Sequence, residues 1–534
     1  MTIILALFFS LTSQYFSQGT LEITKPDEFD SQHKDETIHV IIGGEVTEIP
    51  SKYFQSWPKL ASVNILASVI EIGNYSFSQC PLLESVNIGA NVTTIGEYAF
   101  SSCSKLLNVT IPDSVITLGK ELFQSCHNLQ NVNIGNKVTT IGDSAFANCS
   151  SLQKIYIPDS VTTIGETLFA NCVKLETANI GNNVTTIGNK TFYACNKLTT
   201  VTIGNNVTTI GHYAFYECAS LQSVTIPSSV NEIQDYAFAY CYLLELVNIG
   251  NNIVTYGDYV FTNCSKLKSF YIGDNAMIGS QMFFDCYSLQ SINVSTNNKY
   301  YTNYNNDGVI YNKEITSIIY YPIGLSNAFY NIPNTVSAIN DYVFYNCSSL
   351  ENVTIPNSVS IIGNYAFYSC AKLKIGNIGS SVSVIGNYAF YECNSLENIT
   401  ISNATSTIGN YAFYKCIKLN FLYIGSNVAT IGNYTFYRCT ALYCIYYSGE
   451  KQPQIGASAF DRVPAAQVIT LNSYQDAAFG SFKITNQTEC SVPKDGNNWL
   501  VIGICIGVVV LLIIGFIVFL VICQRRRDGY GSLY

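Results

Sequence analysis

The cysteines are the residues whose chemistry and spacing are most conspicuous in this sequence. Fifteen of them form a ladder in which most neighbours are 23 residues apart. A thiol can form a disulfide, hold a metal ion or act as a nucleophile, and each use needs a different arrangement. The ladder consists of Cys80, Cys103, Cys126, Cys149, Cys172, Cys195, Cys218, Cys241, Cys264, Cys286, Cys347, Cys370, Cys393, Cys416 and Cys439.

The arrangement of the ladder favours buried free thiols. Each member recurs at the same core-facing phase, close after a Phe, and the number of members is odd. Disulfides are the alternative, because an exported protein meets an oxidising compartment, but pairing alternate neighbours would break the equivalence of successive repeats. We therefore expect the ladder thiols to behave as small apolar side chains. Cys444 and Cys490 lie off the ladder and are the candidates for one disulfide.

No group of residues in the sequence predicts catalysis. Metal-binding thiols come in close pairs, whereas these cysteines are separated by whole repeats. The four histidines share no phase of the repeat, and no motif of a serine hydrolase, a zinc peptidase or a phosphate-binding loop is found. A formal charge of −9 lacks the basic footprint that nucleic acids need. The sequence predicts a protein that is not an enzyme and uses no metal, cofactor or nucleic acid.

Acceptor sequons for N-glycosylation are frequent. Several are expected to carry glycans if the host cell modifies asparagine. Asn and Thr are also among the commonest residues of the repeat, so chance sequons are the alternative. The candidate glycosylation sites are Asn91, Asn108, Asn183, Asn206, Asn352 and Asn398.

The elements that carry these residues are short strands and turns, repeated along the chain. In the segment Leu221–Ile226, apolar and polar residues alternate at the end, as a half-buried strand requires. Pro227 and Ser228 then end the strand, Val230–Ile233 forms a second extended piece, and a Tyr-Ala-Phe segment fills the centre. One such coil cannot cover its own apolar side, so neighbouring coils stack about 4.8 Å apart and bury a continuous core. A period of this length built on L-x-x-V-x-I is typical of a leucine-rich-repeat solenoid.

One outward-facing position follows each ladder cysteine by seven residues. Asn, Thr and Tyr on such a strip can hydrogen-bond and stack without charge, as antibody paratopes do. The alternative is purely structural, because Thr and Tyr suit exposed strand positions and Asn suits solubility. The candidate binding strip comprises Asn133, Tyr156, Asn179, Thr202, Thr225, Asn248, Tyr271, Thr354 and Tyr423.

The repeat IG-x-YAF-xx-C-xx-L-xx-V-x-IP-xx-V-xx-IG resembles the BspA-type, or Treponema-type, leucine-rich repeat. The resemblance runs from about Val46 to Phe460, and it implies a protein of the kind found on the surfaces of certain bacteria and parasitic protozoa. The segment Asp307–Pro322 resembles an insert common in that family, and its two β-rich runs around Asn312-Lys-Glu predict a hairpin. The usual Asn or Cys after L-x-x-L-x-L is missing, so we expect turns or short helical turns on the convex side.

The two ends of the chain predict export and a membrane anchor. The first 19 residues have the apolar run and the small, polar segment of a signal peptide. Trp499–Cys523 is uncharged and long enough to cross a hydrocarbon core of about 30 Å. Arg525–Arg527 follow it, which predicts type I topology in the cell membrane with an extracellular ectodomain. In the tail, Tyr530 and Leu533 fit a tyrosine-based sorting motif that would bind a clathrin-type adaptor.

The expected fold is a leucine-rich-repeat solenoid, mainly of short parallel β-strands with turns or short helical turns, followed by a single transmembrane helix. Its expected segments are a signal peptide (1–19), an N-terminal cap (20–60), the solenoid (61–445) with a hairpin insert near 297–322, a C-terminal cap and stalk (446–498), the transmembrane helix (499–523) and a cytoplasmic tail (524–534).

Three functions fit this organisation. The first is a surface protein whose solenoid binds or adheres to a protein or glycan on host or neighbouring cells. The second is an endocytic or signalling receptor that uses the Tyr-x-x-Leu tail, and the third is a passive, glycosylated coat antigen. Uptake that depends on Tyr530 would favour the second function, and the absence of any binding would favour the third.

Overall fold

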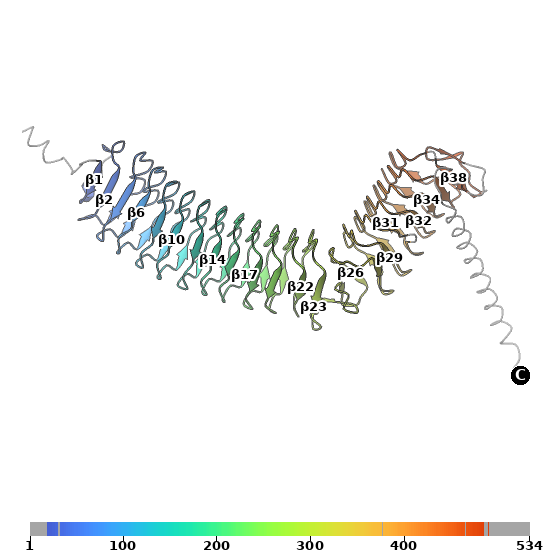
Figure 1. Cartoon of the computed structure of the whole chain (residues 1–534), viewed down its shortest axis with the longest axis horizontal. Helices are drawn as coiled ribbons and strands as arrows, with labels where there is room; N and C mark the ends of the chain where they lie inside the picture. The colour runs from blue at the N-terminus through green and yellow to red at the C-terminus, as the bar shows by residue number, and fades with distance from the viewer. Residues whose placement is uncertain are drawn as a thin grey trace, which may run out of the picture.

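The computed structural model describes residues 19–29, 32–375, 378–464, 466–471, 473–484 and 490. These residues form one long stack of coils, with the first coil at one end and the last coil at the other (Figure 1). The stack bends near β23 (Ser291–Val294) and β26 (Ser317–Tyr320), which divides it into an N-terminal and a C-terminal arm. Apart from the 3₁₀ turn η1 (Pro26–Glu28), the described part of the chain contains strands and turns and no helix.

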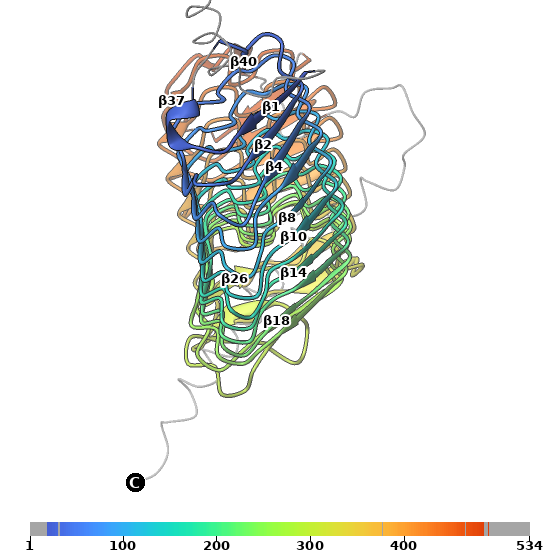
Figure 2. The same cartoon turned by 90° about the vertical axis from the view of Figure 1, so that its left-hand side faces the viewer.

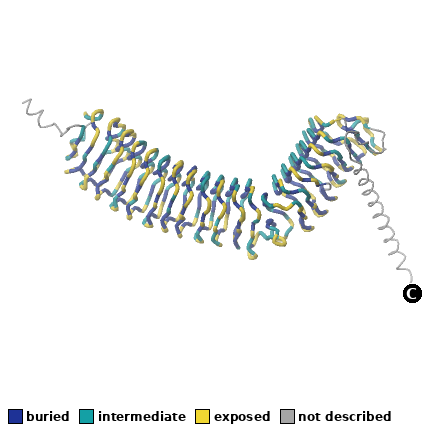
Figure 3. Tube along the Cα trace, viewed as in Figure 1, coloured by how far each residue is buried: buried dark blue, intermediate teal, exposed yellow. Residues whose placement is uncertain are grey.

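Most coils contribute one longer and one two-residue strand. In β18 (Ser223–Ile226), Val224 and Ile226 are buried while Ser223 and Thr225 are exposed, as the alternating pattern predicts. Pro227 follows, and β19 (Glu232–Ile233) then buries its Ile. The same buried positions return in successive coils (Figure 3). The predicted parallel solenoid is confirmed.

The strands of equivalent coils pair in parallel, and most pairs join residues 23 positions apart, such as Thr225 and Asn248. In the view along the stack, the longer strands line one side, and β37 lies on the other (Figure 2). The longer strands are β1 (Thr20–Ile23), β2 (His39–Ile42), β4 (Ser62–Ile65), β6 (Ser85–Asn87), β8 (Asn108–Thr110), β10 (Asn131–Asn133), β12 (Lys154–Tyr156), β14 (Thr177–Asn179), β16 (Thr200–Thr202), β18, β20 (Leu246–Ile249), β22 (Ser269–Ile272), β23, β27 (Phe329–Asn331), β29 (Asn352–Thr354), β32 (Asn398–Ile401), β34 (Phe421–Ile424), β36 (Cys444–Tyr447) and β38 (Gln467–Thr470).

The two-residue strands form the second ladder of parallel pairs. They are β3 (Glu48–Ile49), β5 (Glu71–Ile72), β7 (Thr94–Ile95), β9 (Thr117–Leu118), β11 (Thr140–Ile141), β13 (Thr163–Ile164), β15 (Thr186–Ile187), β17 (Thr209–Ile210), β19, β21 (Thr255–Tyr256), β28 (Ala338–Ile339), β30 (Ile361–Ile362), β31 (Val384–Ile385), β33 (Thr407–Ile408), β35 (Thr430–Ile431) and β37 (Gln454–Ile455).

The glycine after most of the two-residue strands allows close packing between coils, although Gln234 and Asn340 stand at this position after β19 and β28. A Cβ atom on Gly409 would lie 2.5 Å from the carbonyl carbon of Gly386 in the preceding coil. Because that atom is backbone and cannot swing away, a side chain would force the two coils apart. The recurrent Ile-Gly of the sequence is therefore a consequence of stacking.

The Tyr-Ala-Phe segment forms a turn whose backbone amides donate hydrogen bonds both to the next coil and within the turn itself. Tyr213 and Glu217 have φ angles of 57° and 58°, in the left-handed region. The amides of Tyr213 and Phe215 donate to carbonyls of the next coil, and the amide of Tyr216 donates within its own turn. Ala214 and Phe215 are buried as expected. The expectation that the Tyr also fills the centre is wrong, because the left-handed backbone directs its ring outwards, where it is half-exposed.

The core of each arm is built on a row of stacked phenylalanine rings. In the N-terminal arm the row runs from Phe54 to Phe283 with ring centroids 4.8–5.9 Å apart. In the C-terminal arm it runs from Phe344 to Phe460 at 4.8–5.2 Å. Such offset stacking adds to the hydrophobic gain of burying each ring.

The ladder cysteines lie beside this row, and all fifteen are buried and unpaired. The thiol of Cys103 donates to the carbonyl of Phe77 in the preceding coil at 3.1 Å, and most other ladder members repeat this contact. Burial raises the pKa of Cys126 and Cys172 to about 12 from an ordinary value of 9.0. The expected row of free, apolar thiols is therefore present in the structure.

The insert between the two arms is an antiparallel three-stranded unit. β24 (Tyr301–Thr302) pairs with β25 (Ile310–Asn312), which pairs with β26. β26 then runs parallel to β28, so the insert joins the first short strand of the C-terminal arm.

A half-buried carboxylate holds the insert to that arm. The hydroxyl groups of Tyr311 and Tyr330 donate to Asp307 Oδ2 at 3.0 and 3.1 Å, and the two hydroxyl groups also contact each other. Burial raises the pKa of the Asp307 carboxyl above its usual range. On the other side, the Tyr320 hydroxyl donates to the Phe283 carbonyl at 2.6 Å.

The solenoid extends beyond the boundaries of 61 and 445 that the sequence suggests. At the N-terminal end, β1 and β2 already pair in register with β4. At the C-terminal end, β36 pairs with β38, and an antiparallel hairpin of β39 (Ala478–Phe479) and β40 (Phe482–Lys483) covers the last coil. These coils lack ladder cysteines, which is why the cysteine phase did not mark them.

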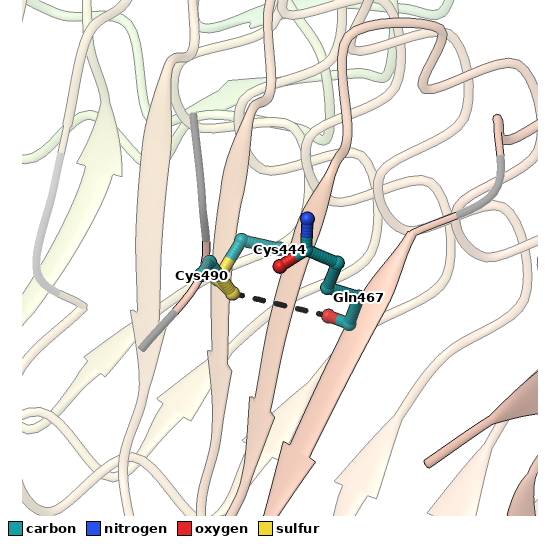
Figure 4. The surroundings of a disulfide bond; sticks show 3 residues. All are labelled: Cys444, Gln467 and Cys490. Carbon is teal, nitrogen blue, oxygen red and sulfur yellow. Dashed lines mark hydrogen bonds between the residues drawn. A yellow bond between two sulfur atoms is a disulfide. The ribbon is translucent and has the colours of Figure 1, made fainter. Parts of the chain in front are cut away.

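A disulfide joins Cys444 of β36 to Cys490, the pair that the sequence places off the ladder (Figure 4). Their Cα atoms are 5.9 Å apart. The Cys490 sulfur also lies 4.0 Å from the backbone carbonyl oxygen of Gln467 in β38. The bond therefore ties residue 490 to β36, and a cross-link over such a loop typically adds about 2–4 kcal/mol to stability.

Several expectations fall on residues outside the described part of the chain. They are the signal peptide, the membrane helix Trp499–Cys523 and the tail motif of Tyr530 and Leu533. Among the described residues, no helix has the length and apolarity needed to span a membrane.

The thiol ladder predicts a pH-dependent stability. Below pH 9 the thiols are protonated in both the folded and the unfolded chain, so they leave the free energy of unfolding unchanged. Above about pH 9 the unfolded thiols ionise while the buried thiols, with pKa values near 12, stay protonated, so the free energy of unfolding falls as pH rises. Urea unfolding under reducing conditions between pH 7 and 11 measures this fall.

The same burial protects the ladder from reagents. Iodoacetamide at pH 8 is expected to leave Cys126 and Cys172 unmodified in the native chain and to modify them after urea denaturation, as read by peptide mass mapping. Rapid modification of these thiols in the native chain would contradict the buried ladder.

Candidate binding surfaces

The candidate binding strip lies on the exposed face of the longer strands. Parallel pairing places Tyr156, Asn179 and Thr202 side by side, and it pairs Thr225 with Asn248. The strip continues along the N-terminal arm through Tyr271, and the C-terminal arm carries Thr354 and Tyr423. The structure therefore brings the residues from Asn133 to Tyr271 into one run, whereas Thr354 and Tyr423 lie on the C-terminal arm without pairing with each other.

Most of the strip is open to solvent. Tyr156 is 56% exposed and Tyr271 is 38% exposed, whereas Asn179 and Tyr423 are half-buried. Some polar groups contact one another, such as Asn248 Nδ2, which donates to Thr225 Oγ1 at 3.5 Å. The strip is uncharged at each of the nine positions, and its hydroxyl and amide groups offer hydrogen bonds along a flat face.

The candidate glycosylation sites also lie at the surface. Five of the six asparagines are exposed, and Asn352 is half-buried. Asn108 and Asn398 begin β8 and β32, on the same side as the strip. Glycans at these two positions would stand beside the strip and limit access to it.

A second surface, which the sequence reasoning missed, is made of two rows of tyrosines on the C-terminal arm. In the first row ring centroids are 4.7–4.9 Å apart, and in the second 4.7–5.2 Å. The sequence signal for these rows is the pattern Tyr-x-Phe-Tyr, preceded by Asp or Asn, in five consecutive coils. The first tyrosine row is Tyr342, Tyr365, Tyr388, Tyr411 and Tyr434, and the second tyrosine row is Tyr345, Tyr368, Tyr391, Tyr414 and Tyr437.

The first row occupies backbone positions that do not favour tyrosine. Tyr365, Tyr388 and Tyr411 have φ angles of 54–57°. The left-handed region costs about 1–2 kcal/mol for a residue with a Cβ atom. In other coils Glu121, Ser144 or other residues adopt the same left-handed backbone at the equivalent position. The backbone geometry is therefore a property of the coil and does not require tyrosine.

An asparagine row runs beside the first tyrosine row. It consists of Asn364, Asn387, Asn410 and Asn433. Each side-chain oxygen accepts a hydrogen bond from the backbone of the next coil, as Asn387 Oδ1 does from the amide of Asn410 at 2.8 Å. The asparagine row therefore helps to fix the coil spacing while its amide nitrogens lie at the surface.

The asparagine row and the first tyrosine row line a groove of about 460 Å³. Asp341, at its N-terminal end, is the one charged residue among those that line it. Partial burial and the neighbouring Tyr365 raise the pKa of Tyr388, in the first row, above its ordinary value, so its hydroxyl stays protonated at neutral pH. The groove thus combines neutral hydrogen-bonding groups with aromatic edges.

The residues of both surfaces carry mainly hydroxyl and carboxamide groups, which suit hydrogen bonding. No cluster of His, Cys, Asp and Glu side chains within the described residues could hold a metal ion.

The repeat and the solenoid can be compared with known proteins. The BspA type leucine rich repeat region, in six copies, matches residues 70–199, 185–309 and 313–443, which is more than half of the chain. This chain belongs to the BspA-type leucine-rich-repeat family. The resemblance seen in the repeat is thereby confirmed, and the BspA-type solenoid is a scaffold that is typically not enzymatic.

Two similar solved structures come from bacteria. A leucine rich cell surface protein from Faecalibacterium prausnitzii is 34% identical, with a TM-score of 0.52 over 58% of this chain and 83% of that chain. A leucine-rich repeat protein from Bacteroides ovatus is 24% identical, with a TM-score of 0.46 over 81% of this chain and 96% of that chain. A comparison with curated proteins gives no match.

The tyrosine rows predict a measurable contribution to stability. Tyr388→Ala removes two stacked pairs, with Tyr365 and Tyr411, each worth about 0.5–1.5 kcal/mol. We expect the local opening free energy of the adjoining coils to fall by about 1–3 kcal/mol in native-state hydrogen exchange. Tyr388→Phe keeps the ring and should leave the exchange unchanged. Equal effects of both substitutions would contradict the stacking account.

Proposed function

We propose that this protein is displayed on a cell surface and binds a protein or glycan on host or neighbouring cells through the outward face of its longer strands. In this proposal the segment Trp499–Cys523 anchors the chain in the membrane with type I topology, and the solenoid stands outside the cell. Membership of the BspA-type family supports a surface role.

The observation that carries the proposal is the exposed, uncharged strip. Asn, Thr and Tyr recur at one position of successive coils, so the strip forms a long face on which weak contacts can add up. Tyrosine is a strong anchor at interfaces because it offers a rigid ring and a hydroxyl group at low entropic cost. Tyr156 and Tyr271 are the most exposed tyrosines of the strip and the expected anchors.

Binding of cells to the full-length chain displayed on a surface tests this function. Replacing both anchors, Tyr156→Lys and Tyr271→Lys, should reduce binding at least tenfold, because truncating interface anchors typically costs about 2 kcal/mol or more. The matched control is Tyr242→Lys, since Tyr242 is 44% exposed but lies off the strip.

Unchanged binding by the double variant, together with normal display, would contradict the strip as the binding face. A wild-type chain that binds no cells would instead favour a passive coat.

A further inference from the structure

The groove on the C-terminal arm differs from the strip in shape and in composition. It is hollowed, it crosses five coils, and it is lined by the asparagine row and the first tyrosine row. We propose that this groove binds a linear, uncharged glycan, with successive sugar rings lying opposite successive coils. The inference rests on the proposed function, because it assigns one site and one ligand class to the same surface protein.

The groove repeats its polar groups at a constant interval. Neighbouring tyrosine rings lie 4.7–4.9 Å apart, and the asparagines belong to the same coils. A phenol hydroxyl both donates and accepts hydrogen bonds, and a carboxamide nitrogen donates two. An extended, β-1,4-linked glycan advances by about one coil spacing per pyranose ring, and successive rings are rotated by about half a turn. Each ring can therefore lie opposite one coil, and the same hydroxyl contact can recur at every second coil.

The asparagine amides have donors to spare for a ligand. The oxygens of Asn387 and Asn410 accept the backbone amides of the next coils at 2.8 and 2.7 Å. Their Nδ2 atoms have no partner among the residues that the structure describes, and both side chains are exposed. A glycan hydroxyl could accept from these nitrogens without disturbing the bonds that hold the coils together.

The charge of the groove favours a neutral ligand. Its lining is uncharged from Tyr342 to Tyr434, and the chain carries a net charge of −9, which repels sulfated or carboxylated glycans. The N-terminal arm has a similar stacked run at Tyr213, Tyr236 and Tyr259. There, Asp235 and Asp258 replace the asparagines, so that run presents carboxylates instead of amides.

An extended peptide fits the spacing less well. A β-strand rises about 3.3 Å per residue and returns a side chain to the same face after about 6.6 Å, so neither interval matches the rows. The exposed edges and hydroxyls of the rings also suit hydrogen bonding, because the ring faces are covered by their neighbours. A second copy of this chain carries rows with the same coil spacing, so the experiment must distinguish self-association from glycan binding.

The test measures binding of β-1,4-linked oligomers of glucose and of N-acetylglucosamine, two to eight units long, to the purified full-length chain by calorimetry. Asn433 begins an Asn-Tyr-Thr sequon at the end of the groove, so the chain is produced without N-glycosylation. Affinity for at least one series should rise with length up to about five units, one for each tyrosine of the first row, and then level off.

The deciding variant is Tyr365→Phe, Tyr388→Phe and Tyr411→Phe together. It removes three hydroxyl groups but keeps the stacked rings, and it should weaken binding at least tenfold. The matched control makes the same change at Tyr213, Tyr236 and Tyr259 in the N-terminal arm and should leave binding unchanged. Circular dichroism and hydrogen exchange check that both variants stay folded.

Binding to neither series, or binding that the triple variant retains, would overturn the groove assignment. So would self-association of the wild-type chain in sedimentation that the triple variant abolishes, because the occupant would then be a second copy. Cell binding through the strip, measured on the same preparation, separates the outcomes. If cells still bind while the oligosaccharides do not, the groove assignment fails and the proposed function stands.

Discussion

Hydrogen bonding between coils of equal length is the constraint on which the rest of this structure depends. Because most coils pair in a register of 23 residues, each residue lies against its equivalent in the next coil. The rows of Phe rings, thiols and asparagine oxygens all follow from that one register. The thiols show its effect on chemistry, since burial beside the Phe row makes potentially reactive groups behave as apolar packing.

The same register means that a residue type repeated at one position of the coil forms a continuous row on the surface. A Tyr or Asn that recurs in one position becomes a row with the spacing of the coils, so weak contacts are presented in series. The two arms share the coil but differ in these rows: the N-terminal arm carries most of the strip, and the C-terminal arm carries the long tyrosine and asparagine rows. The insert, held by Asp307 and Tyr320, separates the arms and lies where the stack bends (Figure 1).

Much of the fold could be predicted from the sequence because buried and exposed residues alternate in a fixed phase. Leu221, Val224 and Ile226 are buried as that phase requires. The ends of the solenoid could not be placed, because the coils at β1 and β38 keep the strand pairing without the cysteine. The tyrosine rows were missed for a physical reason: Tyr365 and Phe367 are two residues apart, and only the left-handed backbone at Tyr365 shows that one ring points out while the other points in.

Removing one whole coil tests the central claim most directly. Deletion of residues 196–218 joins Cys195 to Ala219 and keeps the phase of every other coil, whereas deletion of residues 196–215 shifts it. Hydrogen exchange of both chains measures the protection of the flanking coils. The register account predicts native protection after the in-phase deletion and its loss around the out-of-phase junction. Equal loss of protection in both chains would contradict it.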